Sequence, residues 1–206
     1  MAAKTKDRIL AAALAEFNRH GESNVTTGAI AEAVNISSGN LHYHFPTKQE
    51  LTWTLFSQYE REMLALLATP PDRSAELEDI WLLMHLSFEL MGRYEFVFQD
   101  LSDLCHRYSK IRHHFNGIRK VWGETLRVML SDFEDQEMLD ISPQELTSLI
   151  DSILLISFFW PAYGRVSRSL GGADPNNTVI QIMGLISPYL IPEARAYIKH
   201  LARRYQ

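Results

Sequence analysis

A dense run of hydrogen-bonding side chains between residues 26 and 48 is the strongest chemical signal in the sequence. Serine hydroxyls and asparagine amides can bond base edges, tyrosine and histidine can bond phosphate, and glycine permits close approach to a ligand. Caps at Thr26, Ser37 and Thr47 add helix N-termini, whose backbone N–H groups attract phosphate. The pattern predicts an interface with double-stranded DNA, made by Thr26, Thr27, Ser37, Ser38, Gly39, Asn40, His42, Tyr43, His44 and Lys48.

Two short helices joined by a tight turn must present these side chains, as in a helix-turn-helix. Apolar periodicity predicts a first helix over 5–19, a second from Thr26 through Val34 and a third over 38–44. Asn35 tolerates the positive φ that the turn needs. A capping box at residues 47–50 predicts a fourth helix that continues to about residue 68.

Helical patterns also fill the rest of the chain, and we find no sustained strand alternation or hairpin turn. The expected fold class is all-α, with a three-helix head at residues 1–50 and a larger ligand-binding and dimerisation body at residues 51–206. Pro161 is expected to kink or interrupt a long helix. The predicted body helices cover about 75–98, 101–112, 115–133, 143 to beyond 160, 178–190 and 193–205.

The charge balance gives an ambiguous signal for nucleic-acid binding. The chain has 206 residues and a formal charge of −5, and residues 1–50 carry five basic and five acidic side chains. Nucleic-acid binders usually show a clustered excess of Lys and Arg. Lys4 and Lys6 lie at the N-terminus, where they could reach the DNA backbone. So few cations predict modest non-specific affinity and a shallow salt dependence.

The run from Thr26 to Leu51, TTGAIAEAVNISSGNLHYHFPTKQEL, resembles the DNA-binding head of the TetR family of transcriptional regulators. This resemblance implies a homodimer whose two heads enter successive major grooves of a palindromic operator, and whose body binds a small molecule that releases the DNA. Three positions depart from the family pattern. Asn35 replaces a common glycine, Ser38 stands near a common cation, and His42 replaces a common tyrosine. The asparagine at position 35 is a benign replacement. The changes at Ser38 and His42 are expected to alter two phosphate contacts, and Tyr43 is expected to substitute for one of them.

Aromatic residues are frequent in the body, where they could be core or could line a cavity. A single ring at helical spacing more often belongs to the core, but together the rings fit an apolar pocket between helices with a few polar groups. The expected effector is a small apolar or aromatic molecule. The candidate ligand-binding residues are Trp81, Met84, His85, Phe88, Phe98, His106, Phe115, Trp122, Phe159 and Tyr163.

Metal and catalytic chemistry find little support. Cys105 and His106 are adjacent, as are His113 and His114, and adjacent helical residues point about 100° apart. Metal ligands on a helix need spacings of three or four. We therefore expect a regulator with no metal, no cofactor and no enzymatic activity. The alternative is a helical small-molecule-binding protein or enzyme with a vestigial head, using His106 or His113 in acid–base chemistry.

The helix that begins at Pro143 is apolar around most of its circumference, which a monomer could bury on one side only. The resemblance places a dimer interface on residues 143–169 and 178–190, and a central core helix of a monomer is the alternative. The apolar run 152–164 is too short to span a bilayer, and with one cysteine and no secretory signal the expected location is the cytoplasm. The expected interface residues are Leu149, Ile153, Ile156, Ile182 and Leu185.

Overall fold

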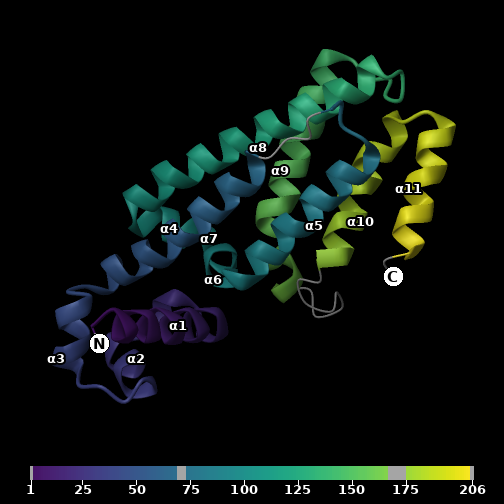
Figure 1. Cartoon of the computed structure of the whole chain (residues 1–206). Helices are drawn as coiled ribbons and strands as arrows, with labels where there is room; N and C mark the ends of the chain where they lie inside the picture. The colour runs from purple at the N-terminus through teal and green to yellow at the C-terminus, as the bar shows by residue number, and fades with distance from the viewer. Residues whose placement is uncertain (1, 69–72, 167–174, 205–206) are drawn as a thin grey trace. The chain divides into compact units, whose positions relative to one another are not determined.

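The computed structural model describes residues 2–68, 73–166 and 175–204, and it confirms the all-α fold class (Figure 1). Within these ranges, extended pairing is limited to one isolated bridge between Leu139 and Leu190. The elements are α1 (Ala2–His20), η1 (Glu22–Asn24), α2 (Thr27–Ala33), α3 (Ser38–His44), α4 (Lys48–Leu67), α5 (Leu77–Arg93), α6 (Glu95–Gln99), α7 (Leu101–Arg107), α8 (Ser109–Asp135), α9 (Pro143–Val166), α10 (Pro175–Ile186), η2 (Ser187–Tyr189) and α11 (Pro192–Arg204).

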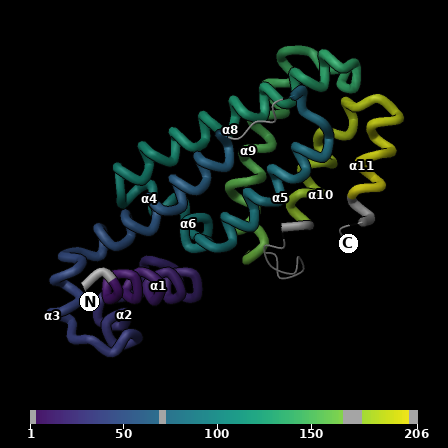
Figure 2. The backbone as a smooth tube through the Cα atoms, in the orientation of Figure 1, coloured from purple at the N-terminus to yellow at the C-terminus, as the bar shows by residue number. Residues whose placement is uncertain are grey.

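The chain divides into two compact units that do not follow a single cut in the sequence. The first unit contains residues 1–61 and 93–115, and the second contains residues 62–92 and 116–206. Helices α4 and α8 are each continuous in the backbone tube (Figure 2), and a boundary between the units falls within each of them, after Arg61 and after Phe115. The first unit therefore includes α6, α7 and the start of α8 in addition to the predicted head.

Side-chain caps define the helix ends of the predicted head. The hydroxyl oxygen of Thr26 accepts a hydrogen bond from the Ala29 amide at 3.2 Å, and that of Ser37 accepts one from Asn40 at 3.2 Å. The turn between α2 and α3 contains Asn35 with a φ of 54°, as its side chain predicted. Such caps satisfy amide groups that a helix leaves free at its first turn. The predicted bounds of α3, 38–44, are confirmed.

The helices of the body differ from the prediction at four places. The predicted helix over 75–98 is broken at Tyr94, and the predicted break near residue 113 lies instead at Tyr108. Pro161, which was expected to kink or interrupt the helix, does not interrupt α9, and it is buried together with Phe158 and Gly164. The break predicted at residues 171–177 falls partly on residues 167–174, which lie outside the described ranges, and α10 begins at Pro175.

The core of the second unit is centred on Trp122 of α8, which is fully buried. Its ring centroid lies 6.5 Å from that of Phe88 on α5 and 5.3 Å from that of Phe158 on α9. The contact with Phe158 is edge-to-face, an arrangement that aromatic quadrupoles favour. These three rings connect α5, α8 and α9.

One helix among the described residues, α9, is long and apolar enough to cross a membrane, with a mean hydropathy of 1.4 in its most apolar window. However, 44% of that window is buried within the protein, and residues of α9 such as Ile153 are completely buried. These properties fit a helix that packs on one side against the core of the second unit.

Candidate nucleic-acid interface and apolar groove

The predicted DNA-binding residues share one property in the structure: none of them is buried. Three of them are half-buried, namely Thr27, His44 and Lys48, and the remaining seven are exposed. Leu41 and Phe45 are buried instead and anchor α3 to the unit. Because the apolar residues of α3 face inward, its polar residues are left on the solvent side, where they can meet a partner.

Tyr43 is the most conspicuous member of this surface. Its side chain is 81% exposed, and its ring packs edge-on against His44 with 5.3 Å between centroids. The neighbouring His42 ring places Nδ1 3.2 Å from the carbonyl oxygen of Pro46. A large aromatic ring left in solvent offers an apolar face and a hydroxyl group to a partner such as DNA.

Lys48 differs from the other predicted contact residues because its ammonium group already has protein partners. Its Nζ lies 3.7 Å from Oε1 of Glu22 and 5.9 Å from the ring centroid of Phe17. A phosphate contact by this side chain would therefore compete with an existing ion pair.

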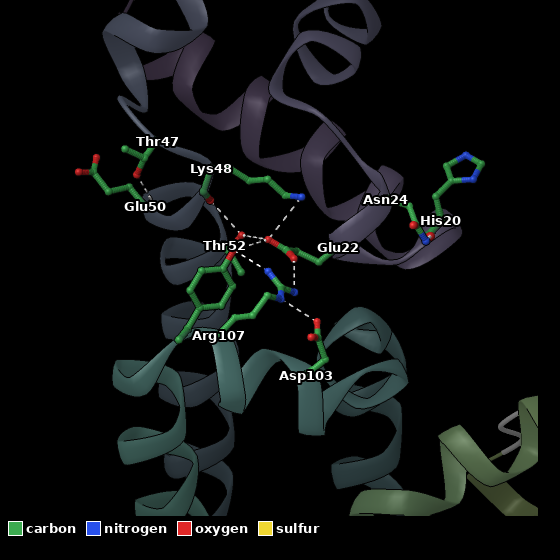
Figure 3. Close-up of polar contacts among 10 residues, drawn as sticks. His20, Glu22, Asn24, Thr47, Lys48, Glu50, Thr52, Asp103 and Arg107 are labelled. Carbon is green, nitrogen blue, oxygen red and sulfur yellow. Dashed lines mark hydrogen bonds and ion pairs between the residues drawn. The ribbon is translucent and has the colours of Figure 1, made fainter.

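Glu22 is a buried carboxylate that joins three segments of the first unit (Figure 3). Its side chain is 1% exposed. It accepts hydrogen bonds from Nη2 of Arg107 at 2.6 Å, from the Tyr108 hydroxyl at 2.9 Å and from the Thr52 hydroxyl at 2.9 Å. A buried charge is tolerated when it is paired and its remaining lone pairs accept hydrogen bonds. The cluster therefore links η1 to the start of α4 and to the corner between α7 and α8.

The partners of Glu22 are themselves tuned by this cluster. Burial would lower the pKa of Arg107, but hydrogen bonds to Glu22 and Asp103 outweigh it and raise the pKa above its ordinary value. Burial, followed by the hydrogen bond to Glu22, raises the pKa of the Tyr108 hydroxyl. Arg107 stays charged and Tyr108 stays protonated, so both remain donors. Sequence reasoning missed this cluster because Glu22 and Arg107 are 85 positions apart.

Asn18 attaches the segment after α5 to α1 in a second place. Its amide nitrogen donates to the Arg93 carbonyl oxygen at 2.9 Å, and its amide oxygen accepts from the Phe96 backbone N–H at 2.9 Å. The rings of Phe17 and Phe96 pack with 5.5 Å between centroids. On α4, the buried ring of Tyr59 contacts Phe98 edge-on at 5.4 Å. Residues 93–115 are therefore bound to both α1 and α4.

The predicted ligand-binding residues are not brought together around one opening. Three of them, Phe98, His106 and Phe115, belong to the first unit, and the other seven belong to the second. His106, Phe159 and Tyr163 are exposed and His85 is half-buried, whereas the others are buried. Rings such as that of Trp122 are in contact with other rings of the core. The buried members act as packing residues in this structure.

An apolar groove of about 820 Å³ opens elsewhere, within the second unit. None of the ten predicted ligand-binding residues lines it. Side chains of α4, α5 and α8 form its walls, and some are unusually exposed for their type, such as Leu82 at 55%. Asp79, one of the lining residues, accepts two hydrogen bonds from Arg73, at 2.7 and 3.2 Å. The lining comprises Leu66, Leu67, Asp79, Leu82, Leu83, Leu86, Lys120, Val121, Glu124, Thr125, Val128 and Met129.

A stripe of exposed apolar residues runs along α9. Its members are Leu155, Phe159, Tyr163 and Val166, with exposed fractions from 45% to 85%. Spacings of four, four and three place them on one face of a helix. Three of the predicted interface residues, Leu149, Ile153 and Ile182, are buried within the chain, and the other two, Ile156 and Leu185, are half-buried. Periodicity identified the helix, but the exposed stripe lies on a different face.

The cysteine and histidine residues of α7 and α8 have ordinary surroundings. Nδ1 of His114 lies 2.9 Å from Oε1 of Glu60. Burial raises the pKa of the Cys105 thiol, which makes it a poor nucleophile at neutral pH.

Comparisons with known proteins agree across both units. A family model described as a bacterial transcriptional repressor, TetR, matches residues 58–198, and one described as bacterial regulatory proteins of the tetR family matches residues 9–52. The biofilm operon icaADBC negative transcriptional regulator IcaR of Staphylococcus epidermidis is 23% identical over 189 residues, covering 90% of this chain and 98% of that protein. The transcriptional regulator QacR of Staphylococcus aureus is 46% identical over 46 residues, which cover 22% of this chain and 24% of QacR.

Among solved structures, a TetR-family transcriptional regulator from Marinobacter aquaeolei VT8 superimposes with a TM-score of 0.86. It is 27% identical in sequence, and the match covers 98% of each chain. The agreement of both family models with the helix-turn-helix and the helical body leads to one conclusion: this chain belongs to the TetR family and is a DNA-binding transcriptional regulator.

Proposed function

We propose that this protein is a homodimeric, cytoplasmic repressor that binds a palindromic operator through α3 and releases it when a small apolar molecule occupies the groove between α4, α5 and α8. The observation that carries the proposal is the groove itself. An opening of about 820 Å³ with mainly apolar walls has the size and character of a small-molecule site.

The exposed residues of α3 are proposed to read the operator. Ser38, Asn40 and Tyr43 project from a helix that is anchored by Leu41 and Phe45. In helix-turn-helix dimers the two recognition helices enter major grooves about 34 to 36 Å apart. Two copies of one chain recognise two copies of one half-site, which is why the operator is expected to be palindromic.

Dimerisation is proposed to bury the apolar stripe of α9. Leu155, Phe159, Tyr163 and Val166 would otherwise leave four large apolar side chains in water. A two-fold axis brings the same stripe of both copies together, which is the commonest way to close a homodimer. Charge in the stripe should oppose this, so Phe159→Arg is expected to give monomers, measured by sedimentation.

The groove favours an uncharged, largely apolar effector. Leucine and valine side chains supply most of the lining, and Met129 adds an adaptable wall. Asp79 is already neutralised by Arg73, and Lys120 lies four residues before Glu124 on α8. A ligand would therefore gain mainly from removing exposed apolar surface such as Leu82 from water.

Release of DNA requires the effector to distinguish two states of the dimer. Helices α4 and α8, which line the groove, also extend into the first unit, where Tyr59 of α4 contacts Phe98 and Tyr108, directly before α8, binds Glu22. A ligand that shifts α4 or α8 would also move the residues of that helix that belong to the same unit as α3. We therefore propose that α4 and α8 transmit occupancy of the groove to the head.

The alternative, a binding protein or enzyme with a vestigial head, is less well supported. The proposed acid–base residues His106 and His113 are exposed side chains, and the family match of the body is to regulators. Selection from a random duplex library tests the choice directly. Wild-type protein should enrich a palindrome, Tyr43→Ala should not, and Tyr43→Phe should retain part of the preference because it keeps the ring. Failure of folded, dimeric wild type to enrich any site would reject operator recognition.

The effector site needs its own experiment. Small apolar compounds would first be selected that raise the melting temperature of the wild-type protein and release it from the enriched duplex. The same compounds would then be tested on Leu82→Lys, which places a charge in the groove. We expect this variant to bind DNA normally and to stay bound to it when the compound is added. Glu89→Lys is the matched control, because Glu89 is exposed on the same helix but lies outside the groove lining. A normal response of Leu82→Lys would place the effector elsewhere.

A further inference from the structure

The segment from residue 104 to 123 is the most cationic part of an otherwise acidic chain. It contains five Lys and Arg residues and three histidines but no Asp or Glu, whereas the whole chain has a formal charge of −5. Arg107 is committed to the buried carboxylate of Glu22. The remaining cations are Lys110, Arg112, Arg119 and Lys120, and all four belong to α8.

Helix α8 separates these charges cleanly from its apolar residues. Ile111, Phe115, Ile118 and Trp122 are buried. The four cations and His113 are exposed, and at 100° per residue they share the opposite half of the helix. Within the described ranges no carboxylate lies within ion-pair distance of these cations. In this exposed basic face, Lys120 lies one helical turn from Glu124, whereas Lys110 and Arg112 have no ion-pair partner in those ranges.

The beginning of the basic face is fixed to the start of α4. Nζ of Lys110 lies 3.8 Å from the ring centroid of Trp53, and His114 contacts the same ring at 4.8 Å and pairs with Glu60. Lys110 also lines a shallow depression of about 330 Å³. The depression is shared with Thr47, Gln49, Glu50, Trp53, Tyr108 and Ile111.

Thr47 is the residue that caps α4, three positions after the end of α3. Lys110 and Arg112 belong to the same compact unit as the recognition helix α3. Lys110 also lines the same depression as Thr47, the capping residue that follows α3.

Two of the five cations of the head are already engaged by polar groups of the protein. Arg8 donates to the Val34 carbonyl oxygen at 2.7 Å, and Lys48 is paired with Glu22. Protein–DNA affinity depends on cations that replace the counterions condensed on phosphates. A head with no net charge supplies little of this, and Lys110 and Arg112, which belong to the same unit, can supply more.

We propose that Lys110 and Arg112, at the beginning of α8, contact backbone phosphates of the operator next to those contacted by the head. Charge complementarity with a duplex is the reason for choosing DNA over an acidic protein or an anionic membrane. The contact carries no base information, because phosphates look alike in every sequence. It extends the DNA-binding surface from the helix-turn-helix to residues 110–112.

The test measures the salt dependence of binding to two duplexes, one enriched by selection with wild-type protein and one of scrambled sequence. The double variant Lys110→Gln/Arg112→Gln removes four positive charges per dimer. The slope of log K against log salt concentration should become shallower by about 2 to 4, since each lost contact contributes about 0.9. Affinity at physiological salt should fall about tenfold or more on both duplexes, with the same preference between them.

Three controls separate this contact from other effects. Lys199→Gln removes an exposed lysine of the second unit and should keep the wild-type slope. Lys110→Arg retains the charge and should also keep it. Tyr43→Ala should lose the preference between duplexes but keep the slope contributed by α8, so failure of operator recognition can be told from failure of this proposal. A wild-type slope for the folded double variant on both duplexes would overturn the proposal.

Discussion

Substitution of Glu22 by glutamine tests the link between the helix-turn-helix and residues 93–115. Glutamine keeps the shape of the side chain but removes its charge, and it leaves Arg107 without its closest partner, at present 2.6 Å away. Hydrogen bonds to charged groups contribute about 1.5–3 kcal/mol each, and breaking a buried pair costs about 3–5 kcal/mol. Because Arg107 is 30% exposed, water can replace part of the loss. We expect the free energy of unfolding to fall by about 2–3 kcal/mol.

Urea unfolding followed by circular dichroism, at one fixed protomer concentration, measures this difference. For a chain of this size it corresponds to a melting temperature lower by about 4–12 °C. Asp103→Asn is the matched control, because Asp103 holds the same guanidinium group at 2.7 Å but is 50% exposed. An exposed pair contributes about 1 kcal/mol or less.

A double-mutant cycle with Arg107→Met isolates the pair itself. The effects of Glu22→Gln and Arg107→Met should be strongly non-additive, because either change alone already breaks the interaction. Hydrogen exchange should become faster in both η1 and α7 of the single variants. A loss below about 1 kcal/mol for Glu22→Gln, or additive effects in the cycle, would refute the reasoning.

Three further predictions concern single side chains. Thr26→Ala removes the cap on the Ala29 amide and should lower stability by about 1 kcal/mol, measured by urea unfolding, whereas Thr26→Ser should be close to neutral. Ser157→Ala should keep or raise the unfolding midpoint, because the Ser157 hydroxyl is buried and has no hydrogen-bond partner in the described ranges; a clear loss would contradict this. Cys105 should react with iodoacetamide more slowly than free cysteine at pH 7.5 because its raised pKa leaves less thiolate, and an equal or faster rate would count against this.

Local chemistry made the first part of the fold predictable. The bounds of α3 follow from its cap at Ser37 and the proline that comes after Phe45, and the start of α4 follows from the capping box at Thr47. Such signals act over three or four residues, so both partners of each contact are close neighbours in the sequence and can be recognised there. The exposure of Tyr43 also follows, because Leu41 and Phe45 must face inward.

The break at Tyr108 shows what local signals leave out. The apolar repeat of Ile111, Phe115 and Ile118 continues one helix, and the chain turns before it where Arg107 and Tyr108 bind Glu22. Nothing near Tyr108 in sequence indicates a carboxylate 86 positions away. A turn that is stabilised by a tertiary contact is therefore invisible to periodicity.

The groove and the α9 stripe were missed for a different reason. Periodicity says that Leu82 or Leu155 belongs to an apolar face, but not whether another helix covers that face. Rings such as Trp122 were expected around a ligand because large aromatic residues suit both cores and pockets. Which of the two they serve depends on how neighbouring helices fill the space between them.

The two-segment composition of the first unit also has a consequence for synthesis of the chain. Glu22 leaves the ribosome 85 residues ahead of Arg107, and Asn18 precedes Arg93 by 75. At about 5–20 residues per second, Glu22 waits roughly 4–17 s for its partner. A nascent chain that stops before residue 93 carries the complete recognition helix but not the segments that close its unit. The chain must therefore be more than half made before this unit can be completed.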